Sequence, residues 1–422
     1  MQNSSRMNKQ NVVIIGAGLA GLTCAVVLRQ NGLDPLVIEK SERIGGRIKT
    51  DKFQGFLLDH GFQVLLTAYP ETKRFLDYQK LNLGEFYNGA VIWTGRKLIK
   101  VADPARDWKA GIRTALSSKT GNIRDKLRLL KLRSDLKRKE IDQILNQISD
   151  KSTREAIQQI GFSDKFVKRF LSPFMRGIFL EKKLSTSAKK FEFVFKMFSQ
   201  GTAALPDRGM AAVPEQLASK LTPQRILLNT AVRSIRGSEV ILEDGKRIHA
   251  DAIVIATDAN DAFRLLNKSE RLPYHAVTCM YYSVTEVPVK GSYLFLNGSG
   301  RGSINNICFP SEINAGYAAG EMSLASVTLL EIPDLLDHEL EEMVYGDLKE
   351  WFGDQVDMWE LLKVYKIPQA LPEQDLISHP DIPRSDAKNI YLCGDYESFA
   401  SINGAMASGR QTAEKIIQKD GK

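Results

Sequence analysis

The 422-residue sequence predicts a two-domain α/β protein in which one domain is built on a parallel β-sheet. Three observations predict this fold. A glycine-rich turn lies between two short apolar runs near the N-terminus, within residues 12–38. A strand-like run followed by a helix rich in small residues occurs at 389–416. The chain is also longer than one ordinary hydrophobic core requires, so two domains are expected.

The first predicted elements form a strand–helix–strand unit. Val12–Ile15 is a β-branched run, typical of a strand that is buried in a parallel sheet. Leu19–Gln30 is rich in Ala and Leu and is predicted to be a helix that stops at Asn31 and Gly32. Leu36–Ile38 is predicted to be the second buried strand. This order is typical of a Rossmann-like domain.

The turn between the first strand and the helix has the G-x-G-x-x-G spacing of a dinucleotide site. Gly16 would make the tight turn, Gly18 would let a pyrophosphate approach the backbone, and Gly21 would let helix and strand pack closely. Leu19 and Ala20 begin the helix, whose free N–H groups would face the phosphates. We therefore predict that these five residues form a cofactor site.

An acidic residue follows the second predicted strand. Glu39 lies 18 residues beyond Gly21, near the spacing expected for an acid that binds a ribose hydroxyl. Its charge would repel a ribose phosphate, which disfavours NADP. The apolar run 12–28 could instead be a signal peptide or a membrane span. A signal peptide needs a small-residue cleavage site, however, and would not explain Glu39.

A second glycine pair extends the predicted cofactor site beyond the first turn. Gly45 and Gly46 are followed by Arg47, and Arg43 precedes them. The two arginines can supply positive charge near a pyrophosphate, and Lys40 is also predicted to contact the cofactor. This extension favours FAD.

The run from Gly16, GAGLAGL…VIEKSERIGGRIKT, resembles the N-terminus of the flavin-containing amine oxidase superfamily, which includes protoporphyrinogen oxidases and phytoene desaturases. The resemblance implies a Rossmann-like FAD-binding domain with a parallel sheet and a discontinuous α+β substrate-binding domain. It assigns residues 1–70, 215–265 and 385–422 to the FAD-binding domain, and 71–214 and 266–384 to the substrate-binding domain.

The C-terminal motif, GDYESFASINGAMASGR, is similar to that of phytoene desaturases. Gly394 and Asp395 form a predicted turn, and a helix is expected from Asn403 onward. Ala405 is one of several small residues that would let a planar ring approach the helix. The helix N-terminus would place positive partial charge near the flavin. By the resemblance, Asp395 binds the flavin ribityl chain.

The middle of the chain carries weaker similarities and two departures. In NTAVRSI, the backbone of Val232 matches the position that meets the adenine. In AVTCMYYSV, Thr278 occupies the position where amine oxidases often carry a flavin-facing lysine. Between Lys363 and Ile390 there is no cysteine, although some members attach FAD through one in this region. We therefore expect noncovalent FAD and poor oxidation of simple amines.

The resemblance implies an FAD-dependent oxidoreductase that removes two electrons from a largely apolar organic substrate by hydride transfer to flavin. Oxygen or a quinone would be the electron acceptor. An amine oxidase and a non-catalytic flavin-binding protein remain alternatives. No nucleophile–base pair or metal cluster is evident, so the catalytic residues stay unknown, with His60 and Thr278 as candidates.

The net charge of +8 is concentrated in residues 96–140, where 15 Lys or Arg and 5 Asp or Glu give a local charge of +10. An amphipathic helical region is predicted there, because apolar residues recur at helical spacing: Ile123, Leu127, Leu130, then Leu132, Leu136, and later Ile141, Ile144, Leu145 and Ile148. Its basic face could be a solvated surface above a core stripe, or could contact an anionic membrane or an acidic partner. No nucleic-acid-binding motif accompanies it.

The cysteines indicate a reducing compartment. They show neither CxxC pairing nor metal-ligand spacing, as expected for buried thiols in a cytosolic protein. The four cysteines are Cys24, Cys279, Cys308 and Cys393. We predict a cytoplasmic protein, with peripheral attachment to the membrane as an alternative.

Overall fold

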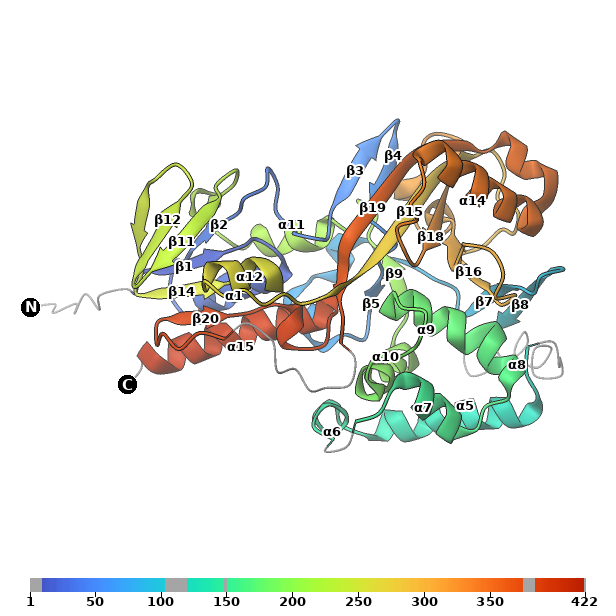
Figure 1. Ribbon diagram of the computed structural model, residues 1–422, viewed down its shortest axis with the longest axis horizontal. Helices are drawn as coiled ribbons and strands as arrows, with labels where there is room; N and C mark the ends of the chain where they lie inside the picture. Colours follow the sequence, from blue (N-terminus) through green and yellow to red (C-terminus); the bar gives the residue numbers. More distant parts are fainter. Residues whose placement is uncertain (1–9, 103–119, 148–149, 375–383, 421–422) are drawn as a thin grey trace, which may run out of the picture.

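A computed structural model describes residues 10–102, 120–147, 150–374 and 384–420. Figure 1 shows an elongated molecule. A parallel sheet and the long helix α15 (Ile402–Asp420) lie at one end, and a large mixed sheet covered by helix α14 (Asp337–Phe352) lies at the other. A group of helices that includes α5 and α10 lies beside the mixed sheet.

The parallel sheet has five strands in the order β10-β2-β1-β14-β20, and all neighbouring pairs are parallel. Its two central strands, β1 and β14, are buried at every residue, as expected for a sheet covered on both faces. The α/β fold predicted from the sequence is therefore confirmed. The strands are β1 Val12–Ile15, β2 Leu36–Ile38, β10 Ile226–Leu227, β14 Ala252–Ile255 and β20 Ile390–Leu392.

Helices cover one face of this sheet and a small antiparallel sheet covers the other. Helix α1 (Leu19–Gln30) packs closely on α15. Gly409 permits this approach, since a Cβ there would lie 2.1 Å from the carbonyl oxygen of Ala20. Val13 and Ile15 face the opposite side, in a core shared with the small sheet. That side holds β11 Val232–Arg236, β12 Glu239–Leu242, β13 Arg247–His249 and α12 Ala259–Leu265, while α11 Ala212–Ala218 packs on α1.

The mixed sheet has seven strands in the order β19-β15-β18-β17-β16-β7-β8. Only β16 and β7 pair in parallel; the other neighbours are antiparallel. Helix α14 covers one face with a core of its own. The strands are β7 Gly89–Trp93, β8 Leu98–Ala102, β15 Tyr274–Val284, β16 Leu294–Asn297, β17 Asn306–Cys308, β18 Ser323–Leu329 and β19 Glu360–Pro372.

A helical layer rich in phenylalanine forms a third core. Its helices are α5 Ile123–Arg138, α6 Ile141–Leu145, α7 Thr153–Ile160, α8 Asp164–Phe166, the π-helix η1 Val167–Leu171, α9 Ser172–Phe179 and α10 Ala188–Gln200. Short connecting elements include β3 Thr50–Phe53, β4 Phe56–Asp59, β5 Leu65–Leu66, α2 Pro70–Phe75, α3 Tyr78–Leu81, β6 Gly84–Glu85, β9 Ala203–Leu205, α13 Pro310–Ile313 and the 3-10 helices η2 Pro223–Arg225, η3 Ala315–Tyr317, η4 Gly353–Met358 and η5 Asp395–Glu397.

Helix α5 differs in part from its sequence interpretation. The predicted amphipathic helix is present, but Ile123, Leu127 and Leu130 are 62%, 61% and 43% exposed rather than buried in a core stripe. The later residues of the predicted stripe do pack in or against the helical core; they are Leu132, Leu136, Ile141, Ile144 and Leu145. Residues 103–119 of the basic segment, and Ile148, lie outside the described residues.

The residues that the structure describes include no helix that combines the length and apolarity needed to cross a bilayer. The run 12–28 that raised this possibility divides into strand β1, a turn and helix α1. The division of the chain into an FAD-binding and a substrate-binding domain stays a prediction.

Candidate active site

A cavity of about 940 Å³ is lined by the carboxyl ends of the parallel strands, by β19 and by the helical layer. Its volume lies near the upper end of the range found for ligand and cofactor pockets, about 300–1,000 Å³. The cavity therefore begins where a doubly wound α/β sheet binds its ligands and continues into a second, more apolar region.

The three glycines of the first turn have three different surroundings. Gly16 has a φ of +108°, which favours glycine, and a Cβ there would lie 2.7 Å from the oxygen of Ala256. A Cβ on Gly21 would lie 2.1 Å from the oxygen of Gly16, so Gly21 serves helix packing and does not line the cavity. Gly18 lines the cavity, and a Cβ there would meet no atom within 4 Å.

The second glycine pair lies directly beside the first turn. Gly45 forms a parallel β-bridge with Gly18, and its N–H donates to the oxygen of Ala17 at 2.9 Å. Gly45 and Gly46 have φ values of +107° and +62°. Gly18, Gly45 and Gly46 all line the cavity, as do Leu19 and Ala20 at the start of α1. The three glycines form a backbone cradle without side chains.

Glu39 is buried at the end of β2 and also lines the cavity. One carboxylate oxygen accepts the N–H of Ala17 at 2.8 Å, and the other accepts the N–H and hydroxyl of Ser41 at 2.9 and 2.6 Å. These bonds fix the carboxylate beside the glycine turn. Lys40, which pairs with Asp261 at 2.5 Å, and Val232 line the same end of the cavity.

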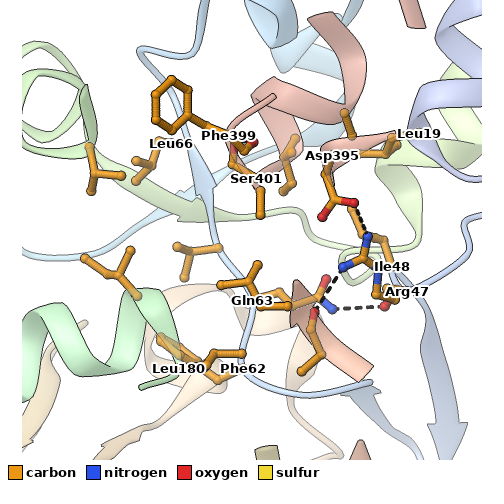
Figure 2. Close-up of a pocket in the computed structure, with 18 of the residues that line it drawn as sticks. Leu19, Arg47, Ile48, Phe62, Gln63, Leu66, Leu180, Asp395, Phe399 and Ser401 are labelled. Atoms are coloured by element: carbon orange, nitrogen blue, oxygen red, sulfur yellow. Dashed lines mark hydrogen bonds and ion pairs between the residues drawn. The ribbon is translucent and has the colours of Figure 1, made fainter. Parts of the chain in front are cut away.

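Arg47 connects the N-terminal and C-terminal motifs. Its guanidinium donates to the carboxylate of Asp395 at 2.5 Å and to the oxygen of Ala370 at 3.2 Å. Its own carbonyl accepts the Gln63 side-chain amide at 3.0 Å, and Figure 2 shows these groups beside one another. The amide oxygen of Gln63 is buried and finds no hydrogen-bond partner in the described chain. Sequence reasoning missed Gln63, since nothing in its sequence context marks it.

The C-terminal motif contributes Gly394, Asp395 and Ala405 to the cavity wall. The N–H of Gly394 donates to the hydroxyl of Ser408 on α15, which fixes the turn against the helix. Asn403 does not line the cavity. Its side-chain oxygen accepts the N–H of Glu71 on α2 at 3.1 Å, so its amide joins two helices.

Arg43, predicted to lie near a pyrophosphate, and His60, a catalytic candidate, lie outside the cavity lining. Both contact the carboxylate of Asp51 instead: the Arg43 guanidinium lies 2.6 Å and the His60 Nε2 atom 3.0 Å from its oxygens. The hydroxyl of Tyr365 donates to the same carboxylate at 2.7 Å. These contacts hold the pKa of Asp51 below its usual range, against the effect of burial. This cluster joins the β3–β4 hairpin to β19.

Thr278 also lies outside the cavity lining. Side chains alternate along a strand, and in β15 Cys279 and Tyr281 face the core that they share with the parallel sheet. Thr278 points the other way, and its hydroxyl donates to the oxygen of Glu331 at 2.7 Å. The structure therefore places neither of the two catalytic candidates at the cavity.

The region of the cavity beyond Arg47 is aromatic. Helices α5 and α10 contribute three cations to it, Lys126, Arg133 and Lys190. The acidic residues in the described lining are Glu39, Asp395 and three others grouped near Lys40 and Val232. Among the described residues no cysteine or histidine lines the cavity. The aromatic side chains of this region include Phe62, Tyr69, Phe86, Phe170, Phe174, Phe193, Phe198 and Phe399.

Residues 19–417 match the sequence profile of the flavin-containing amine oxidoreductases. The chain belongs to this family. An L-amino-acid oxidase from Siganus canaliculatus, whose sequence aligns with 96% of this chain over 85% of its own length, is 26% identical. An oxidoreductase from Methanosarcina mazei has a similar structure, with a TM-score of 0.75, 17% identity and coverage of 97% of this chain and 100% of its own. The structure of putrescine oxidase bound to putrescine is also similar, with a TM-score of 0.70 and 18% identity, and the match covers 97% of this chain and 99% of that chain.

Family membership makes this protein a flavin-dependent oxidoreductase that acts on a small molecule. The cavity fits a flavin cofactor on two observations. The cradle at Gly18 and Gly46 is open to a group that needs close approach to the backbone. The unpartnered oxygen of Gln63 can accept an N–H from a bound ring. The glycine turns from the N-terminal segment thus meet Asp395 and Ala405 from the C-terminal segment at one cavity.

Proposed function

We propose that this protein binds FAD noncovalently and removes two electrons from a largely apolar small molecule, with dioxygen or a quinone as the acceptor. The observation that carries the proposal is the charge of the aromatic region. Its wall combines aromatic and aliphatic side chains with neutral polar ones such as Asn88 and Thr120 and with three cations, and beyond Asp395 the described lining there includes no acid. An amine substrate is protonated near neutral pH, and these cations would repel it. A neutral apolar molecule would enter without this penalty.

Each part of FAD has a proposed set of contacts. Glu39 and Val232 would hold the adenosine half, the cradle at Gly18 and Gly46 would admit the pyrophosphate, and Asp395 would bind the ribityl chain. When bound, the flavin supplies the two-electron acceptor and takes a hydride equivalent from a substrate carbon. The protein's own part is to orient the substrate and exclude water, which the aromatic wall supports.

Noncovalent binding is supported by the absence of cysteine and histidine from the described cavity lining. The four cysteines are buried free thiols away from it. Acid precipitation of the purified yellow protein should release all flavin into the supernatant as FAD. Flavin that stays with the precipitate would contradict noncovalent binding, and release of FMN would contradict the adenosine site.

The substrate class is tested by flavin bleaching under nitrogen. Polyenes, porphyrinogens and other apolar reductants form one panel, and monoamines and polyamines form the other. We expect reduction of the flavin by a member of the apolar panel and slow or no reduction by simple amines. Fast reduction by an amine with no response to the apolar panel would support the amine oxidase alternative. No reduction by either panel would favour a non-catalytic flavin-binding protein.

Peripheral contact with an anionic membrane is a second proposal, supported by helix α5. Its residues Lys126, Leu129, Leu130 and Arg133 form part of the cavity wall. The same helix exposes Ile123, Leu127 and Leu130 among its lysines and arginines. Exposed apolar side chains within a basic helix are typical of interfacial helices. Such a surface would bring an apolar substrate from a bilayer directly to the cavity. A cytoplasmic location stays a prediction.

A further inference from the structure

We propose that the substrate carries an acidic group, such as a carboxylate, and that Lys190 is its counter-ion inside the cavity. This inference rests on the proposed function and adds a polar end to the largely apolar substrate. Lys190 lies on α10, is 2% exposed and lines the aromatic region of the cavity. Phe193 and Val194, three and four residues further along, line it too, so one face of α10 presents a cation beside apolar side chains.

Lys190 has no protein partner that would explain its burial. Within the described residues no hydrogen bond or ion pair forms at its ammonium group, and the ring of Phe179 lies near it, with the nitrogen 5.4 Å from the ring centroid. A buried charge without a partner is strongly unfavourable. A cation kept at such a position in a cavity wall is therefore best explained by a ligand that pairs with it.

A second buried lysine on the same helix provides a comparison. Lys196 also lies among core residues, and its ammonium group donates to the backbone oxygens of Leu136 and Lys137 at 3.0 and 3.1 Å. The protein therefore satisfies Lys196 with its own backbone. It provides no such acceptors for Lys190, which faces the cavity instead.

The acids that act on Lys190 from a distance are already engaged. The carboxylate of Glu181 accepts the N–H and hydroxyl of Ser185 and the N–H of Thr186, at 2.7–3.0 Å. Asp395 is paired with Arg47. Burial lowers the pKa of Lys190 to about 8, while these two carboxylates favour its charged form. Lys190 is thus mostly protonated at neutral pH and can pair with an anion from a ligand.

A carboxylate on an apolar body fits both parts of this region. The phenylalanine side chains can cover the apolar body, and the ammonium group of Lys190 can donate to the carboxylate in surroundings from which water is largely excluded. The cofactor is the other conceivable source of an anionic partner for Lys190. The experiment below separates the two sources, because only a substrate anion makes Lys190 responsible for ligand selectivity.

The test uses the flavin-loaded protein and non-oxidisable probes. Arylalkyl carboxylic acids of two to eight chain carbons are each compared with the corresponding amide and amine by the change in flavin absorbance. We expect the best acid to bind at least tenfold more tightly than its amide, and the amine to bind weakest. Lys190→Met should remove this preference without changing amide binding, and Lys190→Arg, which retains the charge, should keep it.

Lys189→Met is the matched control, because Lys189 is a buried neighbour that does not line the cavity; it should leave the acid preference intact. Wild-type protein without a preference for acids would overturn the proposal, as would a preference that survives Lys190→Met. A Lys190→Met protein that changes flavin loading while keeping acid selectivity would assign Lys190 to the cofactor. Because the probes report binding, failure here leaves the bleaching result, and so the proposed function, standing.

Discussion

The guanidinium of Arg47 lies 2.5 Å from the carboxylate of Asp395, although 348 positions separate the two residues. Both residues line the cavity. Arg47 follows the second glycine pair near the N-terminus, and Asp395 follows β20 near the C-terminus. This ion pair joins the first and last motifs of the chain at the proposed flavin site.

Replacing Asp395 by alanine should remove most of the flavin and lower stability. The carboxylate is buried, and its loss leaves the Arg47 guanidinium with one partner fewer. We expect a loss of about 1–3 kcal/mol in the free energy of unfolding, the usual effect of leaving a polar group unsatisfied. Flavin absorbance per protein and thermal unfolding with added FAD measure the two effects.

Arg43→Ala is the control for this experiment. It removes a comparable ion pair, the 2.6 Å contact with Asp51, from the same segment but outside the cavity. Flavin content should be retained, with a stability change of about 1 kcal/mol, the upper end for an ion pair that is partly open to solvent. Equal loss of flavin in both variants would show that general destabilisation, and not the Asp395 contact, lowers flavin binding.

Gly18→Val should fold and yet lose flavin. A Cβ on Gly18 would meet no protein atom within 4 Å, so the added side chain enters the cavity and occupies the space proposed for the pyrophosphate. Flavin content after purification measures flavin binding, and circular dichroism shows whether the variant is folded. Gly346→Val is the control. Gly346 is exposed on α14, and a Cβ there would also meet no atom within 4 Å, so this variant should keep both its flavin content and its fold. Full flavin content in Gly18→Val would contradict the proposed role.

Binding of acidic probes should weaken as pH rises through about 8. Burial lowers the pKa of Lys190 to about 8, with Asp395 and Glu181 opposing the shift. Below that pH Lys190 is charged and the affinity for a carboxylate has its highest value. Above it the ammonium group of the free protein loses its proton, and the affinity should fall about tenfold per pH unit. Flavin-absorbance titrations from pH 6 to 10 measure this. Lys190→Arg should remove the pH dependence. A wild-type affinity that stays constant from pH 6 to 10 would contradict the role of Lys190 as counter-ion.

Leu127→Ser should reduce binding to anionic vesicles. Leu127 is 61% exposed on α5, between basic residues, and its loss removes apolar contact without disturbing a core. Vesicle flotation should show binding to anionic lipid that weakens at physiological salt, where the screening length is about 8 Å. Leu336→Ser, at a similarly exposed leucine beside α14, is the control. Equal binding of neutral and anionic vesicles would rule out the proposed surface.

The βαβ unit could be predicted from the sequence with its bounds, because local signals determine it. The β-branched runs, the Ala/Leu-rich helix and the glycine spacing each act within about 30 residues, and β1, α1 and β2 begin and end where they were expected.

The positions of Thr278 and His60 could not be predicted, because they depend on long-range packing. A shift of one residue in the position of a strand reverses the face that a side chain occupies, and similarity of β15 to other sequences does not determine which face meets the cavity. The position of His60 depends on Asp51 and on Tyr365 from β19.

The sequence around Lys190 contains a pattern that could have marked this residue as a candidate for the cavity wall. It is the second lysine in AKKFEFVFKMF, three and four residues before Phe193 and Val194. A lysine on the aromatic face of a helix is unusual in a core. The sequence alone, however, did not show whether that face packs against protein or borders a cavity.

The packing of α15 on α1 determines when in the life of the protein the cofactor can be acquired. Strand β20, Asp395 and α15 come from residues 390–420, and they pair with β14, Arg47 and α1 from much earlier segments. A ribosome translates these segments last. The nascent chain can therefore form the glycine turns early, but the proposed flavin site lacks Asp395 and Ala405 until translation has passed them, so we expect the cofactor to bind only after most of the chain has been made.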